Sequence, residues 1–252
     1  VKELLAEKYS EKVVEEGGLK VTTSLDLYKQ KIAEEVVSEG AEKNEKGYNA
    51  TNAALVSLDP KTGQILTMVG SRDYFDLEND GNVNVTLRPR QPGSSFKPLV
   101  YAMAFKKGFT PKTLLFDVVT NFTVVGAKDY IPHNYDDKEH GSISMKSALA
   151  GSLNIPAVKT LYLAGIHNVL DQAKKMGYTT LNDRSRFGLS LVLGGAEVKL
   201  LEHANAFGVL AREGYYHQPI AILKVEDSSG RVLEEYDEKS GSRDNRVLDG
   251  QI

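Results

Sequence analysis

Apolar and polar positions follow two patterns along the chain, one typical of strands and the other of helices. Alternation of the two kinds predicts strands, which lie at 19–25, 53–58, 64–69, 220–225 and 231–236. Apolar residues three and four positions apart predict helices, which lie at 1–16, 26–38, 94–107, 142–164 with a break near 153, 166–176 and 198–213. Strands near both ends, around a helical middle, predict an α+β fold in which helices pack on an antiparallel sheet beside an all-helical subregion.

Turn and cap residues mark the ends of several of these elements. Asp26 is a candidate helix N-cap, and glycines at 17 and 214 follow the first and the last helix. The stretch 39–48 is polar and contains glycines, so we expect a linker or a long turn there. The sequence therefore predicts a linker region at 1–50 that leads into one domain at 51–252.

The composition narrows the classes of protein. The 252 residues are 41% apolar and 26% charged, which is ordinary for a globular protein, and the formal net charge of −3 gives no reason to expect a nucleic-acid partner. The absence of cysteine excludes disulfides, thiol catalysis and thiolate metal sites, and the histidines at 140, 167, 203 and 217 show no metal-ligand spacing, so we expect no metal site. The chain begins at Val1 and has no apolar run long enough to cross a membrane, so we expect any anchor to lie upstream.

A serine and a lysine three positions apart begin the helix predicted at 94–107. Ser94 and Lys97 follow Pro92-Gly93, and residues three apart on a helix share a face. A serine hydroxyl needs a base to take its proton, and a lysine serves as that base only when its surroundings lower its pKa towards neutrality. Backbone N–H groups that are free at a helix start also suit a developing oxyanion. The pattern predicts Ser94 as a nucleophile with Lys97 as its base, although the same spacing is found in ordinary capped helices.

A second serine lies at the break between the two helical parts of 142–164, two positions before an asparagine. The hydroxyl of Ser152 is able to relay a proton, and the amide of Asn154 carries both donors and an acceptor for a lysine and a substrate carbonyl. The alternative is an ordinary helix start, with Asn154 as the N-cap and Pro156 in the first turn. S-x-x-K followed by S-x-N is the motif order of β-lactamases and penicillin-binding proteins, which favours the catalytic interpretation.

Longer blocks of sequence carry a resemblance to one family. The block around the nucleophile reads Arg90-Gln-Pro-Gly-Ser-Ser-Phe-Lys-Pro98, with Tyr101 after it. Further matching blocks lie at 18–26, 54–63, 65–70, 132–135, 148–158 and 193–197. From about residue 17 to 236 the chain resembles the transpeptidase module of bifunctional, class A penicillin-binding proteins. The resemblance implies the α+β fold of serine β-lactamases and D,D-transpeptidases.

The resemblance implies a role for each of the four motif residues in cross-linking peptidoglycan. Ser94 attacks the penultimate D-Ala of a stem peptide and forms an acyl-enzyme, while Lys97 takes its proton. Ser152 carries that proton towards the leaving D-Ala, and Asn154 positions the lysine and the acyl carbonyl. An amine from a neighbouring stem peptide then completes the cross-link. β-Lactams resemble the D-Ala-D-Ala terminus, so they are expected to acylate Ser94 as well.

The block Pro132-His-Asn-Tyr135 borders the substrate cleft in this family. The resemblance therefore implies substrate contacts for His133, Asn134 and Tyr135, with a surface or structural role as the alternative for His133. It also implies peptidoglycan stem peptides and β-lactams as ligands, and no cofactor. For the longer polypeptide it implies an upstream glycosyltransferase module, a C-terminal remainder and a place at the extracytoplasmic face of a bacterial membrane.

The third motif of the family, K-T-G, does not stand where the family has it. Lys61-Thr-Gly63 precedes the nucleophile and follows Asp59-Pro60, so it is interpreted as a hairpin turn, and the run at 238–241 lacks the motif. We expect the true motif beyond Ile252, in a chain shortened at its C-terminus rather than in a degenerate homologue. Three other activities stay open: a D,D-carboxypeptidase, a β-lactamase, and a non-catalytic penicillin sensor or scaffold.

Overall fold

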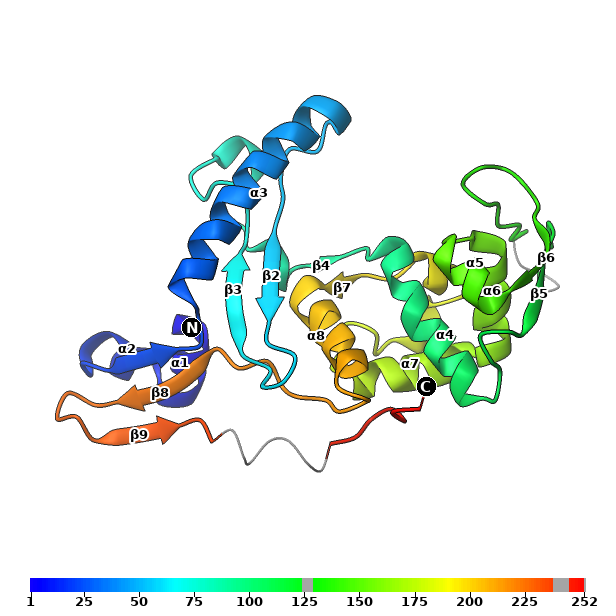
Figure 1. Cartoon of the computed structure of the whole chain (residues 1–252). Coiled ribbons are helices and arrows are strands. Elements are labelled where there is room, and N and C mark those ends of the chain that lie inside the picture. Colours follow the sequence, from blue (N-terminus) through cyan, green and yellow to red (C-terminus); the bar gives the residue numbers. More distant parts are fainter. Residues whose placement is uncertain (124–128, 238–244, 252) are drawn as a thin grey trace. The chain divides into compact units, whose positions relative to one another are not determined.

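The computed structural model describes residues 1–123, 129–237 and 245–251 (Figure 1). The chain forms two compact units, of which the first comprises Val1–Arg88 with Ala204–Arg246, and the second comprises Pro89–His203 with Val247–Ile252. One of the points where the chain passes between them, after His203, falls inside helix α8 (Leu200–Ala211). The predicted division near residue 50 follows a different criterion and stays a prediction.

The first unit contains the predicted strands. Strand β8 (Ile222–Glu226) lies between β1 (Lys20–Thr23) and β9 (Val232–Glu235) in an antiparallel sheet, with Val21 opposite Val225 (Figure 1). Strands β2 (Leu55–Leu58) and β3 (Ile65–Val69) form the other predicted hairpin. Both hairpins predicted from alternating apolar positions are therefore confirmed.

The longest helix of the first unit extends well beyond its predicted end. Helix α3 (Leu27–Tyr48) begins after Asp26, whose carboxylate accepts hydrogen bonds from the backbone of Tyr28 and Lys29, as the N-cap prediction expected. The prediction of a linker at 39–48 was wrong. The buried stripe of Ala33 and Val37 continues to Ala41, and Glu–Lys pairs four positions apart support the exposed face. A Cβ added to Gly40 or Gly47 would meet nothing within 4 Å, so packing does not require glycine at either position and both only weaken the helix.

The first predicted helix is divided in two. Helix α1 (Lys2–Tyr9) and helix α2 (Glu11–Glu16) are separated by Ser10, whose φ of 73° lies in the left-handed region and ends the regular helix.

The K-T-G triplet lies in the turn between β2 and β3, as predicted. The Gly63 N–H donates to the Asp59 carbonyl at 2.9 Å, and the Lys61 N–H donates to the Asp59 carboxylate at 2.8 Å. Gly63 has a φ of 80°, which glycine adopts without strain. The run at 238–241 lies outside the described residues.

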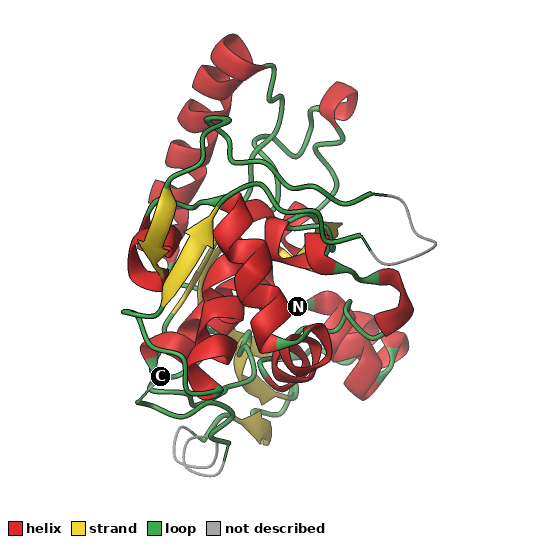
Figure 2. Cartoon of the chain, turned by 90° about the vertical axis from the view of Figure 1, so that its right-hand side faces the viewer, coloured by secondary structure: helices red, strands yellow, loops and turns green. Residues whose placement is uncertain are grey.

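The second unit is mainly helical and holds the candidate nucleophile. Its helices are α4 (Lys97–Lys106), α5 (Met145–Ala150), α6 (Asn154–Ala164) and α7 (Ile166–Lys175), which Figure 1 labels. Figure 2 shows the helices of the chain in red. Helix α4 packs on α6 through fully buried side chains such as Val100 and Val158. None of the helices that the structure describes is long and apolar enough to cross a membrane.

Two short strand pairings and a 3-10 turn complete the second unit and refine the predicted helix ends. Strand β5 (Leu114–Asp117) pairs with β6 (Gly141–Ser144), which occupies residues expected to be helical; Ser144 instead caps α5 by accepting from the Ser147 N–H. Strand β4 (Pro89–Arg90) pairs with β7 (Val198–Lys199), so α8 begins two residues later than predicted. A 3-10 turn, Gly93–Phe96, precedes α4.

Candidate active site

Ser94 lies on the 3-10 turn that leads into helix α4. Gly93 has a φ of 57°, in the left-handed region, which lets the chain turn sharply after Pro92. Phe96 is fully buried and anchors the turn, whereas Ser94 is exposed. The turn, held in place by Phe96, therefore presents Ser94 at the surface of the unit.

Lys97 is buried at the start of α4, and its ammonium group meets the second predicted motif. Only 1% of Lys97 is exposed. Its Nζ donates to the Ser152 carbonyl at 2.6 Å, to Ser152 Oγ at 3.2 Å and to Asn154 Oδ1 at 2.8 Å. Burial lowers the pKa of Lys97 to about 8. The structure thus brings together three of the four predicted catalytic residues around one amine. Proton transfer between Ser94 and Lys97 stays a prediction.

Ser152 turns two oxygen atoms towards Lys97 because its backbone is left-handed. Its φ is 50°, which is uncommon for a residue with a Cβ and costs of order 1 kcal/mol. The conformation ends helix α5, since the Ser152 and Leu153 N–H groups donate back to carbonyls of that helix at 3.0 Å. The role predicted for Ser152 in proton transfer stays a prediction.

The side-chain amide of Asn154 is fixed at both ends. Its Oδ1 accepts from Lys97, and its Nδ2 donates to the His133 carbonyl at 2.9 Å. The alternative of an ordinary N-cap at Asn154 is wrong, because Leu153 occupies the cap position of α6. The capping acceptor comes from elsewhere in the chain: Asn134 Oδ1 accepts from the Asn154 N–H at 2.8 Å.

The three predicted substrate-contacting residues lie in different surroundings. His133 is exposed, and the side chain of Tyr135 stands free of the surface, with a relative exposure of 101%. Asn134 is 3% exposed, and its amide bonds Asp117, the Lys138 carbonyl and the start of α6. Substrate contact stays a prediction for all three.

Gly194, which the sequence analysis named only as part of a longer block, packs against the turn that carries the nucleophile. Gly194 has a φ of 83°, and a Cβ placed on it would lie 2.3 Å from the Gly93 nitrogen and 2.4 Å from the Gly93 Cα. Only glycine permits this approach of two backbones. The adjacent glycines Gly194-Gly195 in the matched block 193–197 were a signal of close backbone packing. Nothing in the neighbouring sequence indicated that Gly93 is the residue approached.

A chain of three side chains braces the same turn. Ser95 Oγ donates to the Pro92 carbonyl at 2.5 Å and lies 2.9 Å from His203 Nε2, while Tyr178 Oη lies 2.7 Å from His203 Nδ1. With the Ser95 proton engaged, His203 Nε2–H donates to Ser95 and Nδ1 accepts from Tyr178. This pattern requires neutral imidazole, which burial favours by lowering the pKa of His203. No sequence pattern pointed to these residues.

Comparison with known proteins places the chain in a family. The model of the penicillin-binding protein transpeptidase domain matches residues 53–251. The chain is 36% identical over 224 residues to penicillin-binding protein 2D of Bacillus subtilis, covering 88% of this chain and 31% of that protein. It is 38% identical over 183 residues to penicillin-binding protein 1A of Aquifex aeolicus, covering 72% of this chain and 24% of that protein. The chain belongs to the penicillin-binding protein transpeptidase domain family, and it spans 24% to 31% of the length of these relatives.

Solved structures agree with the fold. Penicillin-binding protein 1A from Haemophilus influenzae matches with a TM-score of 0.82 at 20% identity, covering 93% of this chain and 48% of that one. PonA1 from Mycobacterium tuberculosis, in complex with penicillin V, matches with a TM-score of 0.80 at 25% identity, covering 99% of this chain and 65% of that one. The predicted α+β fold and the predicted resemblance to class A penicillin-binding proteins are confirmed.

Proposed function

We propose that the chain performs D,D-transpeptidation of peptidoglycan through an acyl-enzyme on Ser94. The observation that carries the proposal is the buried Lys97, whose pKa of about 8 makes its amine a base near neutral pH. An ordinary surface lysine is protonated at that pH and accepts no proton. Family membership supplies the class of reaction, and the geometry around Lys97 supplies the groups for it.

The first half of the reaction forms an ester. Ser94 Oγ bonds to the carbonyl carbon of the penultimate D-Ala as Lys97 takes the hydroxyl proton. The new ammonium finds acceptors already in place on Ser152 and Asn154, so little reorganisation is required. The bond to the terminal D-Ala breaks, and its nitrogen takes a proton. Ser152 Oγ, which both donates and accepts, is the group that passes this proton from Lys97 to the leaving amine.

The second half transfers the acyl group to an amine of a neighbouring stem peptide. The amine attacks the ester, gives its proton to the Lys97–Ser152 pair, and Ser94 is released with its hydroxyl restored. β-Lactams acylate Ser94 by the same first step, with opening of their ring amide. For the longer protein the proposal includes a glycosyltransferase module before this part and a membrane anchor that holds it at the extracytoplasmic face.

Covalent labelling by a penicillin tests this proposal. Incubation of the chain with a labelled penicillin is expected to add one ligand mass to the intact protein. Ser94→Ala removes the attacking oxygen and is expected to lose the adduct entirely, as read by intact-mass spectrometry. Ser142→Ala, at an exposed serine of β6, is the matched control and should be labelled like wild type. Labelling of Ser94→Ala, or a folded wild type without an adduct, contradicts the proposal.

A stem-peptide donor separates the proposed activity from its alternatives. With a suitable amine present, a transpeptidase releases D-Ala over many turnovers and forms a cross-linked product. A carboxypeptidase releases D-Ala without that product, and a sensor releases at most one D-Ala per molecule.

A further inference from the structure

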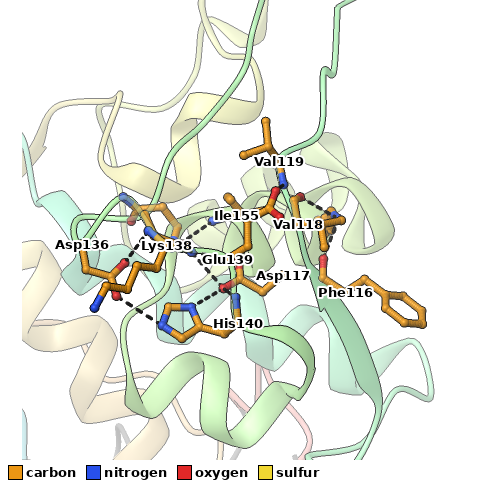
Figure 3. A network of polar contacts seen from close by, with 12 residues as sticks. Phe116, Asp117, Val118, Val119, Asp136, Lys138, Glu139, His140 and Ile155 are labelled. Atoms are coloured by element: carbon orange, nitrogen blue, oxygen red, sulfur yellow. Dashed lines mark hydrogen bonds and ion pairs between the residues drawn. The ribbon is translucent and has the colours of Figure 1, made fainter.

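A buried carboxylate, Asp117 at the end of strand β5, is connected to the candidate active site through the side chain of Asn134. Asp117 has no exposed surface, and its oxygens accept four hydrogen bonds. Figure 3 shows Asp117 beside His140. Asn134 Nδ2 lies 2.9 Å from each oxygen, and Oδ2 also accepts from the backbone N–H of His140 at 3.1 Å and from its Nδ1 at 2.5 Å. Burying a carboxylate is costly unless it is satisfied in this way, so the network is a specific feature of the fold.

The carboxylate decides which way the amide of Asn134 faces. An ionised carboxylate only accepts hydrogen bonds, so the NH₂ end of Asn134 must point to Asp117. The C=O end then points to helix α6, where it accepts from the N–H groups of Asn154 at 2.8 Å and Ile155 at 3.2 Å. Asn154 in turn accepts from Lys97. Asp117 is therefore linked to the amine through Asn134, the Asn154 backbone and the Asn154 side chain.

His140 closes the outer side of this network. Its side chain is 35% exposed, with Nδ1 towards Asp117 and Nε2 at 3.2 Å from the Asp136 carboxylate (Figure 3). The bond to Asp117, together with the charge of Asp136, raises the pKa of His140. Other ionisable groups around Asp117 are Tyr101, Glu139 and Lys159. Lys159 donates to the Phe116 carbonyl, and Glu139 accepts from the Val119 N–H.

We infer that Asp117, Asn134 and His140 are positioning residues that hold Asn154, and through it Lys97, in the geometry needed for acylation. The inference rests on the proposed function for its meaning in catalysis. None of the three residues needs to touch the substrate for this role. Their contribution is to keep the acceptor face of Asn154 on the amine and to keep water away from it.

Asp117→Asn is the sharpest test, since it keeps the shape and replaces an acceptor by a donor. A new NH₂ that faces Asn134 opposes the NH₂ of that residue and favours rotation of its amide, which then presents donors to the N–H groups of α6. A new NH₂ that faces His140 opposes the backbone N–H there and breaks the outer side of the network. The acylation rate constant near pH 7.5 is expected to fall by about 10- to 100-fold. Its dependence on pH is expected to move to higher pH, because water reaches Lys97 and burial no longer lowers its pKa as far.

A merely structural role predicts a different result. Loss of folded protein would lower the rate by the same factor at every pH and leave the midpoint of the pH profile where it was. Asp137→Asn, at an exposed residue of the segment between Asn134 and His140, is the matched control and should leave both unchanged. His140→Ala should lower the rate several-fold, and His140→Gln, which keeps a donor for Asp117, should restore most of it.

A titration of Lys97 by NMR, read at its side-chain nitrogen, tests the network without using acylation. The pKa of Lys97 is expected to be higher in Asp117→Asn and in His140→Ala than in wild type. If wild type forms no penicillin adduct but the titration moves as expected, the proposed function fails and the positioning network stands. If the folded variants titrate and acylate like wild type, the network has no such role and the inference is overturned.

Discussion

Replacement of Lys97 by alanine is expected to lower the second-order rate constant for acylation by a penicillin about 10³-fold, within the range for loss of a general base. The amine is buried and its pKa is lowered to about 8, so it is the group near Ser152 and Asn154 that takes up a proton close to neutral pH. Stopped-flow measurement with a fluorescent penicillin gives the rate constant directly. Thermal unfolding checks that the variant is folded, because alanine removes the cost of burying an amine but also leaves the acceptors on Ser152 and Asn154 without their donor.

Two further variants separate the base from the charge. Lys97→Arg keeps a cation at the site, but a guanidinium does not deprotonate in proteins, so this variant is also expected to fail. Lys112→Ala removes an exposed lysine of the same unit and should acylate like wild type. A Lys97→Ala rate within tenfold of wild type would show that another group activates the nucleophile.

Gly194→Ala is expected to have the largest effect on stability. The added Cβ would lie 2.3 Å from the Gly93 nitrogen, and the φ of 83° is itself strained for alanine. The two costs together are expected to lower the free energy of unfolding by about 3 kcal/mol or more. Because the clash falls on the turn before Ser94, the folded fraction that remains should also acylate more slowly. Urea unfolding and the acylation rate measure the two effects separately.

Gly188→Ala provides the matched control for this substitution. It lies in the segment that precedes Gly194, has a φ of −117°, and a Cβ there would contact nothing within 4 Å. Its unfolding midpoint should stay close to that of wild type. An unfolding midpoint of Gly194→Ala equal to that of Gly188→Ala would contradict the close backbone packing.

The sequence predicted best what depends on neighbours in the chain. The hairpin of β2 and β3 follows from alternating apolar positions and an Asp-Pro-Lys-Thr-Gly turn, and both are local. The meeting of Lys97 with Ser152 and Asn154 is a long-range contact, and no periodicity indicated it. It was expected because the motif order resembles that of one family.

The sequence predicted least well what depends on contacts between distant segments. Asp117 ends a short strand and Gly194 follows a turn, and neither position stands out in the sequence. Only the folded chain shows which residues they approach. The same reason explains the error at the end of α3. Two glycines and many charges within 39–48 favoured a linker, but burial of Ala41 outweighs their small propensity costs.

The dependence of the acylation rate on pH tests the central claim, that neutral Lys97 activates Ser94, most directly. An amine whose pKa is lowered to about 8 is protonated and inactive below that pH, and is free to accept a proton above it. The second-order rate constant of wild type with a penicillin is therefore expected to rise with pH, with a midpoint near 8, and then to level off. A rate that is flat or falls across this range would contradict the account.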